Sequence, residues 1–238
     1  MSTLFISDLH LDAARPAIVE LFERFLAGEA QEAEALYILG DLFESWIGDD
    51  DDSELATRAA RALRGLADHG VPVHFMAGNR DFLLGADYAA RCGMTLLEDG
   101  TVVDLHGTPT LLMHGDTLCT DDAAYQRFRT QVRDPAWQRD FLARPLAERR
   151  AFAAQARAAS QAHTGGASEA IMDVNATAVA AALRQAGVHH LVHGHTHRPA
   201  VHALDLDGQP AERIVLGDWY DQGSVLRVSL GRRQLSRL

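Results

Sequence analysis

The chain has 238 residues, of which 47% are hydrophobic and 23% charged. These values are typical of a globular protein and exclude a disordered or fibrous one. The net charge of −11 argues against a general nucleic-acid binder, and no apolar run reaches the ~18 residues that a membrane span requires. Cys92 and Cys119 are too few for a disulfide framework and fit the reducing cytoplasm. We expect one domain over residues 1–238, with room for an inserted subdomain.

The amino-terminal half alternates between predicted strands and helices. Short apolar runs indicate buried strands. Pro16 in a first turn, Gly28 just past a last turn and Ser53 as a cap mark helix ends. The expected elements are a strand over 3–7, a helix over 16–27, a strand over 35–39, a helix from 53 to about 70 and a strand over 71–76. This β-α-β-α-β order predicts an α/β fold with parallel strands.

The carboxyl-terminal half adds a helical region between strands. We expect strands over 102–105, 110–113, 191–193, 200–206, 213–216, 224–228 and 234–238, and helices over 123 to about 162 and over 168–186, separated by Gly165-Gly166. Residues 123–163 hold eight arginines against three acidic residues, and the chain contains no lysine. Residues 123–167 are therefore expected to form a basic helical insertion, whose cationic contacts would all be planar guanidinium groups.

Side chains that can bind metal follow five of the expected strands. They are Asp8 with His10, Asp41, Asn79, His114, and His195 with His197. Residues two apart in an extended segment face the same side, so two of His193, His195 and His197 can share an ion, but this parity does not choose between them. One such cluster alone is as well explained by a histidine-rich turn without an ion. Five clusters at successive strand ends favour a metal site.

The donor set combines carboxylate, imidazole and amide oxygen without sulfur, which suits two hard-to-borderline divalent ions. We expect Mn²⁺, with Mg²⁺, Fe²⁺, Co²⁺ or Zn²⁺ able to substitute in vitro. Asp41 is the candidate for the shared ligand, because its two carboxylate oxygens can face different ions. Two such ions activate water and neutralise charge on a phosphoryl oxygen. The predicted chemistry is hydrolysis of a phosphoester or a pyrophosphate.

The same clusters resemble the signature motifs of the calcineurin-like metallophosphoesterases. The motifs read Asp8-x-His10, Gly40-Asp41, Gly78-Asn79-x-Asp81, His114-Gly115 and Gly194-His195-x-His197. The resemblance implies a β-sandwich flanked by helices. It also implies two ion sites, one formed by Asp8, His10, Asp41 and His197 and the other by Asp41, Asn79, His114 and His195.

Many family members carry histidine where this chain has Arg80. A histidine there is a candidate proton donor, whereas arginine stays charged and is expected to bind phosphate oxygens, which favours a leaving group that needs no proton.

Longer segments resemble one subgroup, the UDP-2,3-diacylglucosamine diphosphatases of lipid A biosynthesis. The segments are 42–49, 79–85, 114–122 and 170–175. The resemblance implies hydrolysis of the UDP-sugar lipid to UMP and 2,3-diacylglucosamine 1-phosphate (lipid X), by an enzyme bound peripherally to the cytoplasmic face of the inner membrane. From the net charge we expect no nucleic-acid partner, and no protein partner is evident in the sequence. The residues expected to act in catalysis are Asn79, Arg80 and His195. The substrate contacts expected are Asn79, Arg80, Asp122, Tyr125, Arg157, Ser160, Thr164 and His195. Relatives can carry Asn and Lys where this chain has Thr164 and Ala167, and Arg157 is the candidate to compensate.

Several alternatives remain at this stage. The apolar residues of the insertion either pack inside it, or form a lid that holds acyl chains while its arginines meet anionic head groups. The acidic run Asp49–Asp52 is expected to be the solvated start of a helix. The rival functions are a dimetal phosphodiesterase or nucleotide diphosphatase without lipid specificity, and a binding scaffold that keeps the metal site without turnover.

Overall fold

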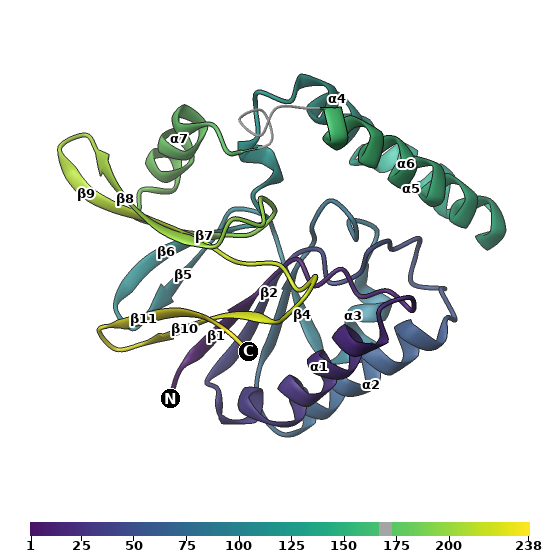
Figure 1. The fold of residues 1–238 in the computed structure, drawn as a ribbon, viewed down its shortest axis with the longest axis horizontal. Coiled ribbons are helices and arrows are strands. Elements are labelled where there is room, and N and C mark those ends of the chain that lie inside the picture. Colours follow the sequence, from purple (N-terminus) through teal and green to yellow (C-terminus); the bar gives the residue numbers. More distant parts are fainter. Residues whose placement is uncertain (167–172) are drawn as a thin grey trace.

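The computed structural model describes residues 1–166 and 173–238, apart from the side chains of residues 161–166. In this part of the chain the strands form two sheets with helices on their outer faces (Figure 1). The first sheet has the strand order β11-β10-β1-β2-β3-β4 and the second has the order β5-β6-β7-β9-β8. The strands are β1 (Thr3–Ile6), β2 (Ala35–Leu39), β3 (Val73–Met76), β4 (Met94–Leu97), β5 (Thr101–Leu105), β6 (Thr108–Met113), β7 (His190–His193), β8 (Ala200–Leu206), β9 (Gln209–Val215), β10 (Ser224–Ser229) and β11 (Arg232–Arg237). The helices are α1 (Pro16–Ala27), α2 (Glu54–Asp68), α3 (Ala86–Cys92), α4 (Ala123–Val132), α5 (Pro135–Leu142), α6 (Leu146–Gly166) and α7 (Ala176–Ala186), with short 3₁₀ turns at Glu29–Glu32 and Asp116–Leu118.

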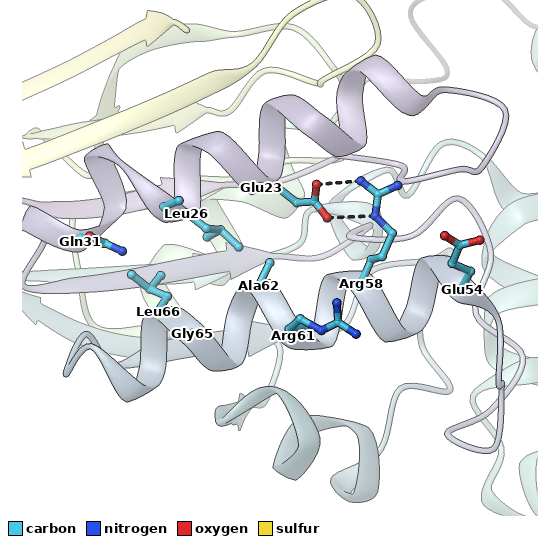
Figure 2. Close-up of a pocket in the computed structure, with 10 residues that line it drawn as sticks. Glu23, Leu26, Gln31, Glu54, Arg58, Arg61, Ala62, Gly65 and Leu66 are labelled. Atoms are coloured by element: carbon cyan, nitrogen blue, oxygen red, sulfur yellow. Dashed lines mark hydrogen bonds and ion pairs between the residues drawn. The ribbon is translucent and has the colours of Figure 1, made fainter.

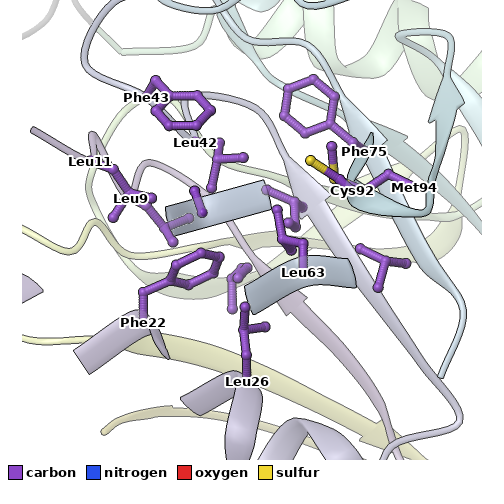
Figure 3. Close-up of a cluster of buried hydrophobic side chains, with 14 of the residues drawn as sticks. Leu9, Leu11, Phe22, Leu26, Leu42, Phe43, Leu63, Phe75, Cys92 and Met94 are labelled. Carbon is purple, nitrogen blue, oxygen red and sulfur yellow. The ribbon is translucent and has the colours of Figure 1, made fainter. Parts of the chain in front are cut away.

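The first sheet is parallel from β1 through β2 and β3 to the edge strand β4, and β10 joins β1 antiparallel. Its outer face is covered by α1, α2 and α3 (Figure 1). The apolar residues between them form the largest buried cluster, part of which Figure 3 shows around Phe22, Leu42, Leu63 and Phe75. This rigid layer fixes where each parallel strand ends, and therefore where the following polar loops begin.

Helices α1 and α2 run side by side, and Arg58 bridges them by a bidentate ion pair to Glu23 (Figure 2). A pocket between the two helices is lined by residues such as Leu26, Ala62 and Leu66. None of the predicted metal-binding side chains lies on it, so this pocket is separate from the candidate site.

The second sheet also has a parallel centre, formed by β6, β7 and β9. Its outer face packs on α7, which begins with Asn175 as its cap and ends at Gly187 in the left-handed conformation. The inner faces of both sheets share one buried cluster that includes Phe5, Leu112 and Val192. The sandwich flanked by helices, implied by the family resemblance, is confirmed.

The insertion consists of three helices rather than one continuous stretch. Asp122 and Asp134 cap α4 and α5, and Pro135 occupies the first turn of α5. Figure 1 shows α4, α5 and α6 grouped beyond the two sheets. Phe141 and Phe152 pack with Trp137 at ring-centroid distances of 4.9 to 5.7 Å, whereas Phe128 is 40% exposed. Internal packing therefore accounts for some of the apolar residues of the insertion but not for all of them.

Besides the division of the helix predicted over 123 to about 162 into α4, α5 and α6, the predicted elements differ from the structure in three places. Helix α3 and strand β4 were not predicted; α3 is too short to show a helical period, and β4 is an edge strand with two exposed residues. Helix α6 ends at Gly166 rather than near residue 162, so it includes Gly165-Gly166, where a break was expected; the residues that follow lie outside the described part of the chain. The helix predicted over 168–186 was too long, because residues 173–175 are not helical and α7 begins at Ala176; the start of that prediction lies outside the described residues.

Candidate dimetal site

The predicted donors all follow the carboxyl ends of strands, as the sequence indicated. Asp8 follows β1, Asp41 follows β2, Asn79 follows β3, His114 follows β6, and the last two histidines follow β7. Five of these residues adopt a positive φ, a conformation that costs free energy in residues other than glycine: Asp8 (55°), His10 (48°), Asp41 (54°), His195 (70°) and His197 (55°). Such backbone strain concentrated in one place marks a functional site.

The first group of donors is formed by Asp8, His10 and His197, whose ligand atoms lie within 4.8 Å of one another. The Nε2 atoms of the two histidines are 3.2 Å apart. His197 Nε2 also lies 3.4 Å from Asp8 Oδ1. Three donor atoms that face one point in this way form one side of a coordination sphere.

The second group combines Asp8, Asp41 and His114, again within 4.8 Å. Asn79 Oδ1 lies 2.9 Å from His114 Nε2 and 2.9 Å from His195 Nδ1. Asp41 reaches both groups, since its Oδ1 is 3.8 Å from His114 Nε2 and its Oδ2 is 3.8 Å from His10 Nε2. The structure thus brings together all seven predicted donors, with Asp41 between the two groups.

Two glycines of the motifs are required by this close approach. A Cβ atom at Gly78 would overlap the Asp41 carboxylate, and a Cβ atom at Gly194 would overlap the carboxylate of Asp8 and the hydroxyl of Ser7. The loops can therefore meet only if these positions carry no side chain.

The charges of the site are strongly coupled. Burial opposes the ionisation of Asp8, but the neighbouring His197 and other histidines hold the pKa of its carboxyl well below its usual range. Burial acts against the charged form of His114 as well, yet the carboxylates of Asp41, Asp116 and Asp8 raise its pKa to about 9. Burial and the nearby His114 lower the pKa of His195 to about 4. An excess of buried carboxylate is thus balanced by histidine protons, which divalent cations can replace.

Several atoms of the site fit such cations. Asp8 Oδ1 is buried and has no hydrogen-bond partner among the described residues. His114 Nδ1 donates to the Leu39 carbonyl (2.9 Å), which leaves its Nε2 for an ion. Arg80 Nε is likewise buried without a hydrogen-bond partner in the described chain, and the Arg80 backbone N–H donates to Asp41 Oδ1 (2.8 Å). Oxygen and imidazole donors together with a guanidinium whose Nε lacks a partner in the described chain suit two divalent ions and an anionic ligand.

Three buried acids that support the site were not assigned a role from sequence. Asp81 accepts backbone N–H groups from Leu42 (2.7 Å) and Gly78 (2.8 Å) and so ties together the loops of Asp41 and Asn79. Glu44 lies 3.1 Å from His10 Nδ1. Asp116 accepts the hydroxyl of Tyr125 (2.6 Å). Asp81 and Asp116 stand within the matched motif segments, which could have drawn attention to them.

Two of the predicted substrate contacts, Tyr125 and Arg157, lie next to residues of this centre. The Tyr125 ring lies 6.0 Å from the His195 ring, and Arg157 pairs with Glu44 (3.1 Å) and Asp12 (3.6 Å). Asp122 caps α4 by accepting the Tyr125 backbone N–H (2.9 Å), and Ser160 is half-buried on α6. The Thr164 side chain and Ala167 lie outside the described residues.

Comparison with known proteins agrees with the geometry of this site. Residues 1–199 match the family model described as calcineurin-like phosphoesterase. The chain belongs to this family. Its fold is similar to that of a solved archaeal phosphodiesterase, with a TM-score of 0.51, 11% sequence identity, and 100% of this chain and 99% of the other covered. At that identity the likeness concerns the fold alone.

Relatives within the phosphoesterase family are much closer in sequence. A UDP-2,3-diacylglucosamine hydrolase of Xanthomonas axonopodis pv. citri is 59% identical over 245 aligned positions, covering 100% of this chain and 99% of the relative. A protein of the same name from Stenotrophomonas maltophilia is 56% identical with the same coverage. The family and these relatives identify the chain as a metal-dependent hydrolase.

Proposed function

We propose that this phosphoesterase hydrolyses the pyrophosphate bond of UDP-2,3-diacylglucosamine, releasing UMP and 2,3-diacylglucosamine 1-phosphate. The observation that carries the proposal is the convergence of seven oxygen and nitrogen donors next to Arg80, whose backbone N–H donates to Asp41 and whose buried Nε has no hydrogen-bond partner among the described residues. The name shared by relatives that align with the whole chain supplies the substrate.

The two ions would be held by Asp8, His10, Asp41 and His197 on one side and by Asp41, Asn79, His114 and His195 on the other. Mn²⁺ is the proposed ion, because the donors are carboxylate, amide oxygen and imidazole without sulfur. When bound, the ions supply Lewis-acid activation of water and of the phosphoryl group. Asn79 and His195 act in the reaction by keeping their donor atoms directed to the same point.

Arg80 binds the pyrophosphate. Its guanidinium cannot give up a proton at neutral pH, so its contribution is charge and a planar fork of donors toward phosphoryl oxygens. A UMP leaving group fits this chemistry, because a phosphate oxygen leaves as an anion without first being protonated. Asp122, Tyr125, Arg157, Ser160 and Thr164 are the proposed contacts to the remainder of the substrate.

The insertion is proposed to select the lipid. Phe128 and Leu142 are each 40% exposed on α4 and α5, in the segment that also carries the excess of arginines. Exposed apolar side chains next to cations suit acyl chains and an anionic membrane surface. On this basis we propose peripheral binding to the cytoplasmic face of the inner membrane. Among the described helices, none is both long enough and apolar enough to cross a membrane.

The direct test is UMP release from UDP-2,3-diacylglucosamine, compared with UDP-glucosamine that lacks both acyl chains. We expect the diacylated substrate to be preferred by at least ~100-fold in kcat/KM, since each buried methylene contributes ~0.8 kcal/mol. Equal rates for both substrates would assign the chain to nucleotide diphosphatases without lipid specificity.

Asp41→Ala should retain the fold and lose ~10³-fold or more in rate. Unchanged turnover would refute the role of Asp41.

Membrane binding is tested by sedimentation with vesicles that contain 30% anionic phospholipid, a composition of roughly physiological surface potential. Binding should weaken in vesicles without anionic lipid and in Phe128→Ser. Equal sedimentation with both vesicle types would contradict an electrostatic contact.

A further inference from the structure

The loop between β9 and β10, residues 216–223, reaches the first group of metal donors from the opposite end of the sequence. It lies outside residues 1–199, the part matched by the family model. The Trp219 backbone N–H donates to the carbonyl of Asp8 (3.0 Å). The Trp219 side chain is fully buried against Phe22 and Phe25. This anchor gives the loop a fixed position over the carboxyl end of β1.

The residue after this anchor, Tyr220, contacts both histidines of that group. Its ring stacks on the His10 ring with a centroid distance of 5.2 Å and an interplanar angle of 7°. It also lies 5.4 Å from the His197 ring. Because His10 Nε2 and His197 Nε2 are only 3.2 Å apart, one aromatic ring restrains both imidazoles.

Arg15 holds Tyr220 in this place. Its guanidinium lies over the Tyr220 ring, 4.9 Å from the centroid, and one of its N–H groups donates to the carbonyl of His10. A cation over an aromatic ring contributes ~0.5–1 kcal/mol or more, so the pair stabilises a stack that would otherwise be half open to water, since Tyr220 is 44% exposed.

Asp218 of the same loop faces Nδ1 of His197, the ring nitrogen that points away from the other donors of the group. Its Oδ2 lies 3.8 Å from His197 Nδ1, and its Oδ1 accepts the Tyr220 backbone N–H (3.1 Å). A carboxylate near the outer nitrogen of a metal-binding histidine helps to orient the ring. The loop thus reaches Asp8, His10 and His197, and no contact of this kind is recorded between Tyr220 and His114 in the described chain.

We infer that Tyr220 is a positioning residue for one of the two ions, the one bound by Asp8, His10 and His197. This inference rests on the dimetal site of the proposed function and adds to it an asymmetry between the two ions. The aromatic ring, rather than the hydroxyl, performs the task, because the stacking contact is made by the ring face.

The test is titration of the chelator-treated full chain with Mn²⁺, followed by calorimetry and by the electron paramagnetic resonance signal, which distinguishes an isolated Mn²⁺ from a coupled pair. The variants are Tyr220→Ala, Tyr220→Phe and, as a matched control, Asp221→Ala at the adjacent exposed position. We expect Tyr220→Ala to weaken one of the two binding steps by ~10–100-fold, the usual effect of removing a group that orients a ligand. The other step should be unchanged, and Tyr220→Phe and Asp221→Ala should bind as the wild type does.

Three results would overturn the inference. Tyr220→Ala could bind both ions with wild-type affinity, it could weaken both steps equally, or Tyr220→Phe could be as defective as Tyr220→Ala. Melting of the chelated variants is the folding control, and we expect chelated Tyr220→Ala to unfold cooperatively within about 4 °C of the chelated wild type, the shift that the loss of ~1 kcal/mol produces in a chain of this size. A wild-type chain that fails to bind two ions would instead refute the proposed function, so the two failures are distinguishable.

Discussion

At the residue scale, the site depends on glycines that lie so close to neighbouring groups that no side chain would fit there. Gly194 lies so close to Ser7 and Asp8 that a Cβ atom there would overlap both side chains. By contrast, Gly65 in the interior of α2 has no atom within 4 Å of the position that its Cβ would take. The two glycines therefore offer opposite outcomes for the same chemical change.

We predict that Gly194→Ala lowers the free energy of unfolding by about 1–3 kcal/mol through overpacking and reduces metal binding, because Asp8 must move. Gly65→Ala should raise the free energy of unfolding by about 0.5–1 kcal/mol, since alanine favours the helix interior. Denaturant unfolding and metal content measure both effects. A Gly194→Ala protein as stable and as rich in metal as the wild type would contradict the overlap.

The two cysteines give a second prediction at this scale. Burial raises the pKa of both Cys92 and Cys119 to about 12. We expect neither thiol to react with a disulfide reagent at pH 8 in the folded protein, and both to react in urea. Because the folded pKa is raised, the unfolded chain releases these protons first, so stability is full below about pH 9 and declines as pH rises toward 12. Rapid reaction of the native thiols at pH 8 would be inconsistent with their burial.

At the element scale, the acidic run Asp49–Asp52 is not simply a solvated helix start, as the sequence suggested. Asp49 accepts N–H groups of Gly85 (2.9 Å) and Tyr88 (3.0 Å) at the start of α3, and Asp50 pairs with Arg149 of α6. Arg149 also donates to the carbonyl of Ile47 (2.7 Å). The run thus attaches the insertion to the sandwich.

Arg149 and its neighbour Arg150 form a matched pair for testing this attachment. Arg149 is 2% exposed, whereas the Arg150 side chain is 52% exposed and pairs with Asp51 and Asp52. We predict that Arg149→Ala costs about 1–3 kcal/mol, because the buried Ile47 carbonyl loses its donor and the ion pair with the exposed Asp50 is lost, and that Arg150→Ala costs at most about 0.5 kcal/mol. Chemical denaturation measures the cost, and limited proteolysis should cut the insertion faster in Arg149→Ala only. Equal effects of the two substitutions would contradict a buried attachment.

At the scale of the whole molecule, the candidate site joins the two sheets. Asp8, Asp41 and Asn79 follow strands of the first sheet, and His114 and His195 follow strands of the second. Ions bound between them would link the two halves of the sandwich, so ligand binding and folding stability are coupled.

We therefore predict that a chelator lowers the melting temperature by roughly 5–10 °C for each emptied site, taking ion concentrations about 100-fold above Kd. Adding Mn²⁺ back should restore it. Asp41→Ala should show a smaller response than the wild type, because it removes the donor that both sites share. A melting curve insensitive to chelator and to Mn²⁺ would argue against ions between the sheets.

The sequence by itself determined the strands of the two sheet centres, the helices α1 and α2, and the donors at the strand ends, because these depend on local periodicity, caps and short motifs. Strand parity alone did not choose among His193, His195 and His197, and the family motif pointed to the last two. The tertiary structure gives the physical reason: His193 is buried with Nδ1 on the Gly194 carbonyl, while the other two face the site. The division of the insertion into three helices could be predicted in part, because Asp134-Pro135 is typical of a helix start. The roles of Asp49, Glu44, Asp81 and Tyr220 could not be read in this way, because each depends on contact with a residue 34 or more positions away in the chain. Contacts of that range are set by how the sheets and helices pack, which no local pattern of residues encodes.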